Sequence, residues 1–180
     1  AVREGGCAMI RYACIGAGGI ARKKHLQGYS RLPQVELAAI CDTNRAAAEA
    51  LAREYGIPRV YTDYRELLQV EKPDLVSICT PNVTHKDITI AALEQGACVH
   101  VEKPMTMNAA EAREVLEAQK RTGKLVQVGL NKRFTSAAVL LRRLLEAGYF
   151  GEIYQAGNGT AEFPEQADGL QTGRFPVAAL

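Results

Sequence analysis

Apolar and polar residues alternate along the chain with two different periods, which predict strands and helices in turn. Short apolar runs rich in strand-forming residues lie at 10–16, 35–41, 74–80, 98–102 and 125–130. Between these runs, apolar residues recur at helical spacing over about 20–31, 44–55, 84–95 and 109–121. We expect a short helix after Asp63 and a last helix that includes 140–145.

Capping residues and glycines agree with these boundaries. Asp42, Thr43 and Asn44 offer side-chain oxygens ahead of the second long helix, and Asn108 does so ahead of the helix at 109–121. Glycine, which commonly ends helices, follows four of the predicted helices, at Gly56, Gly96, Gly123 and Gly148.

Strands that are apolar on both faces and separated by helices imply a parallel sheet covered on both sides. Because crossovers in such sheets are nearly always right-handed, the α/β class with a doubly wound, Rossmann-type sheet is the simplest topology. We therefore predict a Rossmann domain over 9–130, followed over 131–180 by a linker helix and the incomplete start of a second domain. From about Gly157 the periods weaken, which predicts either an irregular connection into that domain or a disordered tail.

Composition narrows the function classes. With 47% hydrophobic residues among 180, the chain can build one sizeable core, and a net charge of +2 is too small to suggest a nucleic-acid or membrane partner. No apolar run approaches the roughly 18 residues that a membrane span needs. The five cysteines form no CxxC pair, which favours small buried side chains in a reducing compartment, taken as the cytoplasm, over disulfides or a zinc site.

The first chemical motif is GAGGIA, which lies between the first strand and the first helix. Gly16 would allow the tight turn, Gly18 would let a pyrophosphate approach the backbone, and Ala21 would let helix and strand pack closely. The phosphates would then meet the helix N-terminus at Gly19 and Ile20. Methyltransferases and plain glycine turns share this motif, so its place between strand and helix is what favours a dinucleotide.

Asp42 ends the second strand, close to the expected place of the acid that binds the ribose hydroxyls, about 20 residues after the glycine motif. The alternative is a helix N-cap, since one carboxylate does not easily serve both roles. A carboxylate there would repel a 2′-phosphate, so NAD is favoured over NADP. Arg45 weakens the expected preference for NAD over NADP, because it could stack on adenine or bind a phosphate.

Two further motifs end strands. The turn Thr80-Pro81-Asn82 is followed by Thr84 and His85, and its alternative role is a capping turn for the next helix. The sequence Glu102-Lys103-Pro104 leaves the next strand, where it is either a solvated strand end or a site from which the lysine reaches cofactor or substrate. A cis Lys103–Pro104 bond would help to aim the lysine, although trans is the commoner state. All four motifs map to one edge of the sheet, where doubly wound folds bind their ligands.

In this order and spacing, GAGGIA, ICD, TPNVTH and EKP resemble the N-terminal domain of the Gfo/Idh/MocA family of dehydrogenases over roughly 10–156. The resemblance implies that Lys103 contacts the nicotinamide ribose and the substrate as a catalytic residue. It also implies that Thr80, Pro81, Asn82 and His85 line the nicotinamide side. Glu102 would line the cofactor pocket.

The resemblance further implies a sugar or cyclic polyol as substrate. A second α/β domain would then form the substrate pocket, often together with a homo-oligomer interface. The family's usual acid/base is a histidine of a DxxxH motif in that domain, whereas this chain has only His25, His85 and His100. We therefore do not expect turnover from residues 1–180 alone. His25 is interpreted as a packing or surface residue and His100 as a hydrogen-bonded core residue.

The sequence thus predicts an NAD(P)-dependent dehydrogenase domain that transfers hydride between a nicotinamide cofactor and a secondary alcohol. The alternative is a non-catalytic dinucleotide-binding or sensor module, in which the four motifs only hold the cofactor. A methyltransferase ranks last, because the Lys103-Pro104 element has no evident task there.

Overall fold

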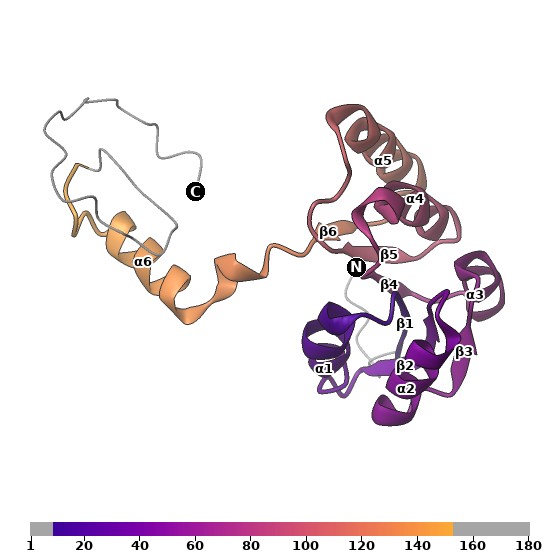
Figure 1. Cartoon of the computed structure of the whole chain (residues 1–180). Coiled ribbons are helices and arrows are strands. Elements are labelled where there is room, and N and C mark those ends of the chain that lie inside the picture. The colour runs from indigo at the N-terminus through magenta and orange to yellow at the C-terminus, as the bar shows by residue number, and fades with distance from the viewer. Residues whose placement is uncertain (1–8, 153–180) are drawn as a thin grey trace, which may run out of the picture. The chain divides into compact units, whose positions relative to one another are not determined.

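The computed structural model describes residues 9–152, and its contacts divide the chain into two compact units, Ala1–Leu130 and Asn131–Leu180. The first unit contains a six-stranded sheet in the order β3-β2-β1-β4-β5-β6, with every neighbouring pair parallel (Figure 1). The prediction of a doubly wound parallel sheet is confirmed. The strands are β1 (Ile10–Ile15), β2 (Val35–Cys41), β3 (Arg59–Tyr61), β4 (Leu75–Ile78), β5 (Cys98–Val101) and β6 (Val126–Val128).

Helices connect the strands. The first helical segment contains a π-helical turn, η1 (Ala21–Leu26), that continues into α1 (Gln27–Tyr29). The others in this unit are α2 (Arg45–Tyr55), α3 (Tyr64–Glu71), the 3₁₀ turn η2 (Asn82–Thr84), α4 (His85–Glu94) and α5 (Ala109–Thr122).

Each face of the sheet has its own core, because successive side chains of a strand point to opposite faces. On β1, Tyr12 and Cys14 pack with residues of η1 and α2, while Ala13 and Ile15 pack with residues of α3, α4 and α5. All four side chains are at most 2% exposed. Burial on both faces explains why the sequence of this strand is apolar without alternation.

Local capping explains most helix starts. The side chains of Asn44, Asp63 and Asn108 each accept a backbone N–H from the first turn of α2, α3 and α5. No side chain caps α4, so the capping role considered for Asn82 and Thr84 is wrong. The 3₁₀ turn η2 leads directly into α4 instead and supplies its first backbone acceptors.

The short strand β3 was not predicted; it pairs with β2, and its side chains contact a buried carboxylate. Glu71, at the end of α3, has a fully buried side chain that accepts hydrogen bonds from Arg59 and Tyr61 of β3 and from Arg11 of β1. Burial would raise the pKa of Glu71, but the hydrogen bonds and positive charges of its partners outweigh burial and lower it. A strand of three residues is too short to show an alternating pattern in the sequence. Its formation depends on contacts with other elements of the fold.

The second unit is described only over 131–152. It contains the 3₁₀ turn η3 (Asn131–Phe134) and α6 (Ser136–Glu146), which Thr135 caps and Gly148 follows with a φ of 70°. No residue of α6 is buried, and its apolar side chains include exposed Leu140 and Leu141. The irregular segment expected from Gly157 lies outside the described residues. Among the helices of residues 9–152, none combines the length and the hydrophobicity of a bilayer-spanning segment.

One glycine fixes how closely two central strands meet. Gly16, just after β1, has a φ of +101°, and a Cβ added there would lie 2.6 Å from both the carbonyl carbon and the oxygen of Cys79. At Gly18, by contrast, an added Cβ has no neighbour within 4 Å. Gly16 and Gly18 therefore have different roles, and of these two only Gly16 is required by packing within the domain.

Gly16→Ala should destabilise the domain by about 2 kcal/mol or more, because the methyl group meets backbone atoms and the residue has a left-handed conformation. Gly18→Ala is the matched control and should change the free energy of unfolding by less than about 0.5 kcal/mol. Urea unfolding followed by circular dichroism measures both. Equal unfolding midpoints for the two variants would contradict this account of Gly16.

Candidate cofactor site

The four motifs follow four parallel strands and so meet at one edge of the sheet. Gly16 follows β1, Asp42 follows β2, Thr80 comes after β4 and Glu102 follows β5. The Gly16 N–H donates to the carbonyl of Cys41 at 2.7 Å. The strand order reverses between β1 and β4, and ligands of open α/β sheets bind beside such a switch point.

The glycine loop presents bare backbone at this edge. Gly18, Gly19 and Ile20 are exposed, and a Cβ at either glycine would have no neighbour within 4 Å. The helical segment begins at these residues, so its first N–H groups have no partner within the helix. Open backbone at a helix start fits a pyrophosphate, which binds such groups together with the positive end of the helix dipole.

Asp42 joins the glycine loop to the end of β2. Its two carboxylate oxygens accept the N–H of Ala17 at 2.6 Å and the N–H of Asn44 at 2.8 Å. The N-cap of α2 is Asn44, whose side chain accepts from Ala47, so the alternative N-cap role of Asp42 is wrong. A carboxylate has about four acceptor positions, so two bonds leave capacity for the hydroxyls of a ribose.

Arg45 opens α2 but is engaged elsewhere. Its guanidinium lies 3.0 Å from Glu49 one turn along the helix, and its side chain is 63% exposed. Exposed pairs of this kind contribute little and exchange readily with other partners. The role proposed for Arg45 toward adenine or a phosphate stays a prediction.

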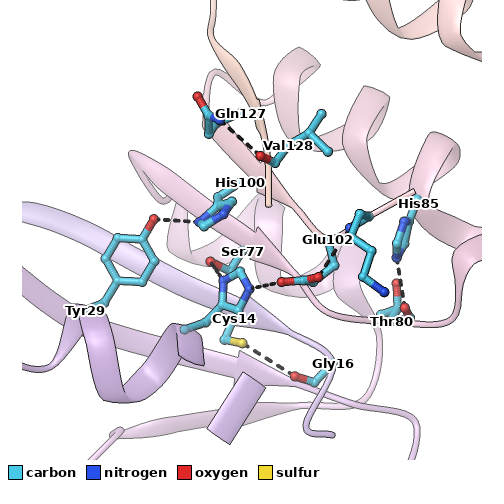
Figure 2. Close-up of polar contacts among 12 residues, drawn as sticks. Cys14, Gly16, Tyr29, Ser77, Thr80, His85, His100, Glu102, Gln127 and Val128 are labelled. Carbon is cyan, nitrogen blue, oxygen red and sulfur yellow. Dashed lines mark hydrogen bonds and ion pairs between the residues drawn. The ribbon is translucent and has the colours of Figure 1, made fainter. Parts of the chain in front are cut away.

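His85 was expected to line the nicotinamide side, but it is buried between the loop that follows β4 and the segment that follows β5. The residue is fully buried, and one ring nitrogen lies 2.7 Å from the carbonyl oxygen of Pro104. The other lies 2.9 Å from the carbonyl oxygen of Thr80 (Figure 2). The ring therefore holds the two loops together and does not face an open nicotinamide pocket, which corrects the expectation. Pro81 and Asn82, in the turn between, are exposed.

Lys103 is an exposed cation at this edge. It follows the buried residues Val101 and Glu102, and its peptide bond to Pro104 is cis, the state considered from the sequence. Its backbone N–H lies 3.3 Å from a carboxylate oxygen of Glu102. The lysine therefore leaves a buried strand at a defined position, with its side chain in solvent.

A buried polar cluster behind this edge was not predicted. Glu102 is only 7% exposed, and its carboxylate lies 2.9 Å from Nε2 of His25, whose Nδ1 lies 2.9 Å from the Ser77 hydroxyl. Figure 2 labels Glu102 and Ser77 of this cluster. Glu102 therefore faces the interior, whereas we expected it to line the cofactor pocket. His25 lies four residues after the small Ala21 on the same helical segment, a spacing that could have placed it on the sheet-facing side.

His25 is buried, which agrees with a packing role, and His100 is hydrogen-bonded as expected but only partly buried. His25 and His100 are hydrogen-bonded, and the Tyr29 hydroxyl lies 3.0 Å from Nδ1 of His100. The four described cysteines are free thiols. Burial, helped by the nearby Asp42 charge, raises the pKa of Cys41 to about 12, so this thiol stays protonated. Among residues 9–152 no group of acidic, histidine or cysteine side chains could hold a metal ion.

Comparison with known proteins agrees with this geometry. A model of the Gfo/Idh/MocA family, an oxidoreductase family with an NAD-binding Rossmann fold, matches residues 10–130. D-glucoside 3-dehydrogenase from Escherichia coli K12 is 39% identical over 145 residues, which cover 81% of this chain and 41% of that protein. The NAD(+)-dependent scyllo-inositol 2-dehydrogenase of Bacillus subtilis 168 is 35% identical over 149 residues, covering 82% of this chain and 44% of that protein.

Among solved structures, myo-inositol 2-dehydrogenase from Lactobacillus plantarum superposes with a TM-score of 0.76 at 26% identity, covering 81% of this chain and 43% of that one. The chain thus spans less than half the length of each of these relatives. The match confirms the resemblance noted in the sequence and, at the level of the family, NAD as the cofactor. Through its NAD-binding Rossmann domain, this chain belongs to the Gfo/Idh/MocA family of oxidoreductases.

Proposed function

We propose that the chain is the cofactor-binding part of an NAD-dependent dehydrogenase that acts on a secondary alcohol of a sugar or cyclic polyol. The observation that carries the proposal is the open backbone of Gly18 next to Ala17, whose N–H is held by the Asp42 carboxylate. A pyrophosphate and the adjacent ribose need these two features side by side. Relatives named for a glucoside and an inositol support the substrate class.

Bound NAD would supply the hydride acceptor, and the residues of the chain would hold and orient it. The N–H groups at Gly19 and Ile20 would bind pyrophosphate, and Asp42 would accept from ribose hydroxyls. Thr80, Pro81 and Asn82 would bound the nicotinamide side, at the end of β4. His85 would act behind them by fixing the Thr80 and Pro104 carbonyls.

Lys103 is the residue that we assign to the reacting oxygen. Its ammonium group is a hydrogen-bond donor that could orient an alcohol and stabilise negative charge developing on its oxygen. Lys103 emerges beside the buried Glu102, so its backbone is fixed while its side chain can reach out. A base that takes the alcohol proton would come from a second domain, for which 131–180 would be the start. A homo-oligomer formed through that domain stays a prediction.

A non-catalytic dinucleotide-binding or sensor module remains the second candidate. The observation in its favour is that the polar atoms of His85 and Glu102 are already engaged within the fold. Of His85, Glu102 and Lys103, only Lys103 would then contact the ligand. Both candidates require cofactor binding, and turnover distinguishes them.

Gly18→Val should abolish NADH binding without unfolding the domain, because the branched side chain would occupy the space left for the pyrophosphate. Gly28→Val is the matched control, since Gly28 also has no neighbour within 4 Å but lies in α1, outside the loop. NADH fluorescence titration measures binding, and circular dichroism checks the fold. A folded Gly18→Val variant with unchanged affinity would remove the phosphate site from this loop.

The unmodified chain should bind NADH more tightly than NADPH, and Asp42→Asn should narrow that preference by about tenfold as the charge that repels a 2′-phosphate is lost. Asparagine keeps an oxygen that can accept the Ala17 N–H, so the loop should keep its shape. Titration with both nucleotides gives the ratio of dissociation constants. Equal affinities in the unmodified chain would speak against the role of Asp42.

In a form of the protein that includes a substrate domain, Lys103→Met should lower kcat on a polyol about 100-fold or more while NADH binding is largely kept. Residues 1–180 alone should show negligible turnover. A dehydrogenase assay over a panel of sugars and inositols, read at the NADH absorbance, measures both. Unaltered turnover in Lys103→Met would exclude the lysine from the mechanism, and strong activity of the short chain would show that the base lies within it.

A further inference from the structure

The buried carboxylate of Glu102 needs a partner, because an ionised group away from water is costly unless it is hydrogen-bonded. Its Oε1 lies 2.9 Å from Nε2 of His25, with side-chain exposures of 9% for Glu102 and 1% for His25. This contact is the direct link between the two side chains. The Ser77 hydroxyl, 2.9 Å from Nδ1, fixes the other side of the ring.

The elements that meet here belong to both halves of the proposed cofactor site. His25 lies in η1, the segment that begins at the glycine loop, and Ser77 lies on β4. Glu102 follows β5 and accepts from the backbone N–H of Lys103 through its other oxygen, at 3.3 Å. The imidazole is therefore a bridge between the pyrophosphate end and the nicotinamide end of the site.

The surroundings leave His25 as the partner of this carboxylate. His100 packs against the His25 ring, with ring centroids 4.5 Å apart, but burial and then the charge of His25 lower the pKa of His100 to about 4. His100 is therefore neutral at pH 7 and bonds to Tyr29 instead. At the end of β6, Gly129 leaves room for the carboxylate, since a Cβ there would lie 3.0 Å from its Oε1.

We propose that His25 is a positioning residue, which fixes Glu102 and through it the backbone of Lys103 against the phosphate-binding helix. This inference rests on the proposed function, because it assumes that Lys103 serves the nicotinamide end. Loss of the His25 contact should then weaken the contribution of the nicotinamide nucleoside to binding and leave the adenine and phosphate contacts unchanged. A merely structural role would weaken both alike.

Two substitutions separate the two ring nitrogens. In His25→Asn the amide can take the place of Nδ1 toward Ser77 but does not reach Glu102, whereas in His25→Gln the longer side chain can donate from the place of Nε2. Tyr29→Phe is a matched control, since it removes a hydroxyl that contacts His100 but not His25 or Glu102. The ligands are NADH and ADP-ribose, which lacks the nicotinamide group.

In the 180-residue chain, His25→Asn should bind NADH about tenfold more weakly, the scale of one lost hydrogen bond to a charged group, and ADP-ribose within about twofold of the unmodified chain. His25→Gln should recover most of the NADH affinity, and Tyr29→Phe should keep it. Calorimetric titration gives the constants, and urea unfolding checks that each variant is folded. A proportional loss for both ligands, or no loss for either, would overturn the positioning role.

If His25→Asn does not fold, the Ser77→Ala variant tests the positioning role of His25 instead. Ser77 is fully buried and its hydroxyl lies 2.9 Å from Nδ1 of His25, so its loss should weaken NADH binding selectively, and an unchanged ratio of NADH to ADP-ribose affinity would refute the inference. The proposed function fails separately, if the unmodified chain does not bind NADH or binds it no better than ADP-ribose. An unmodified chain that prefers NADH, with variants that keep that preference, would reject only the role of His25.

Discussion

The site depends on the close approach of two backbones at the point where the strand order reverses. β1 and β4 are neighbours in the sheet, and beyond their ends Gly16 lies so near the Cys79 carbonyl that no side chain fits between them. That approach places the glycine loop at the carboxyl edge and directs the helix start at Gly19 toward the same region. A parallel sheet brings all its strand ends to one edge, so Asp42, Thr80 and Lys103 gather there as well.

Polar contacts then tie the loops of this edge to one another. Asp42 holds the glycine loop through the Ala17 N–H, and His85 holds the Thr80 and Pro104 carbonyls. Behind them the His25–Glu102 pair joins the first helical segment to the segment that carries Lys103. Loops carry most of the functional residues, and a site of this kind needs such supporting contacts to keep its ligand-binding groups in place.

The same pattern separates exposed residues, which the proposed function assigns to the ligand, from buried residues that support them. Gly18, Gly19, Ile20 and Lys103 are exposed and free to meet a ligand, whereas His25, His85 and Glu102 are buried with their polar atoms engaged. A cofactor that places hydride within reach of a substrate must be held rigidly at both ends. In the proposed function the buried residues would supply that rigidity, which would give polar side chains within the core a functional reason.

By itself, the sequence determined the parallel α/β class, nearly all the strands and helices, and the position of the glycine motif, Asp42 and Lys103 at one edge of the sheet. These features follow from local periods, from caps such as Asn44 and Asn108, and from motifs placed at strand ends. Tertiary structure alone decided the strand β3, which Glu71 stabilises from another element, the burial of His85, and the pairing of His25 with Glu102 across 77 positions. The identity of a polar residue does not show whether its side chain contacts solvent, a ligand or a buried partner. The packing of distant segments decides which of these it contacts.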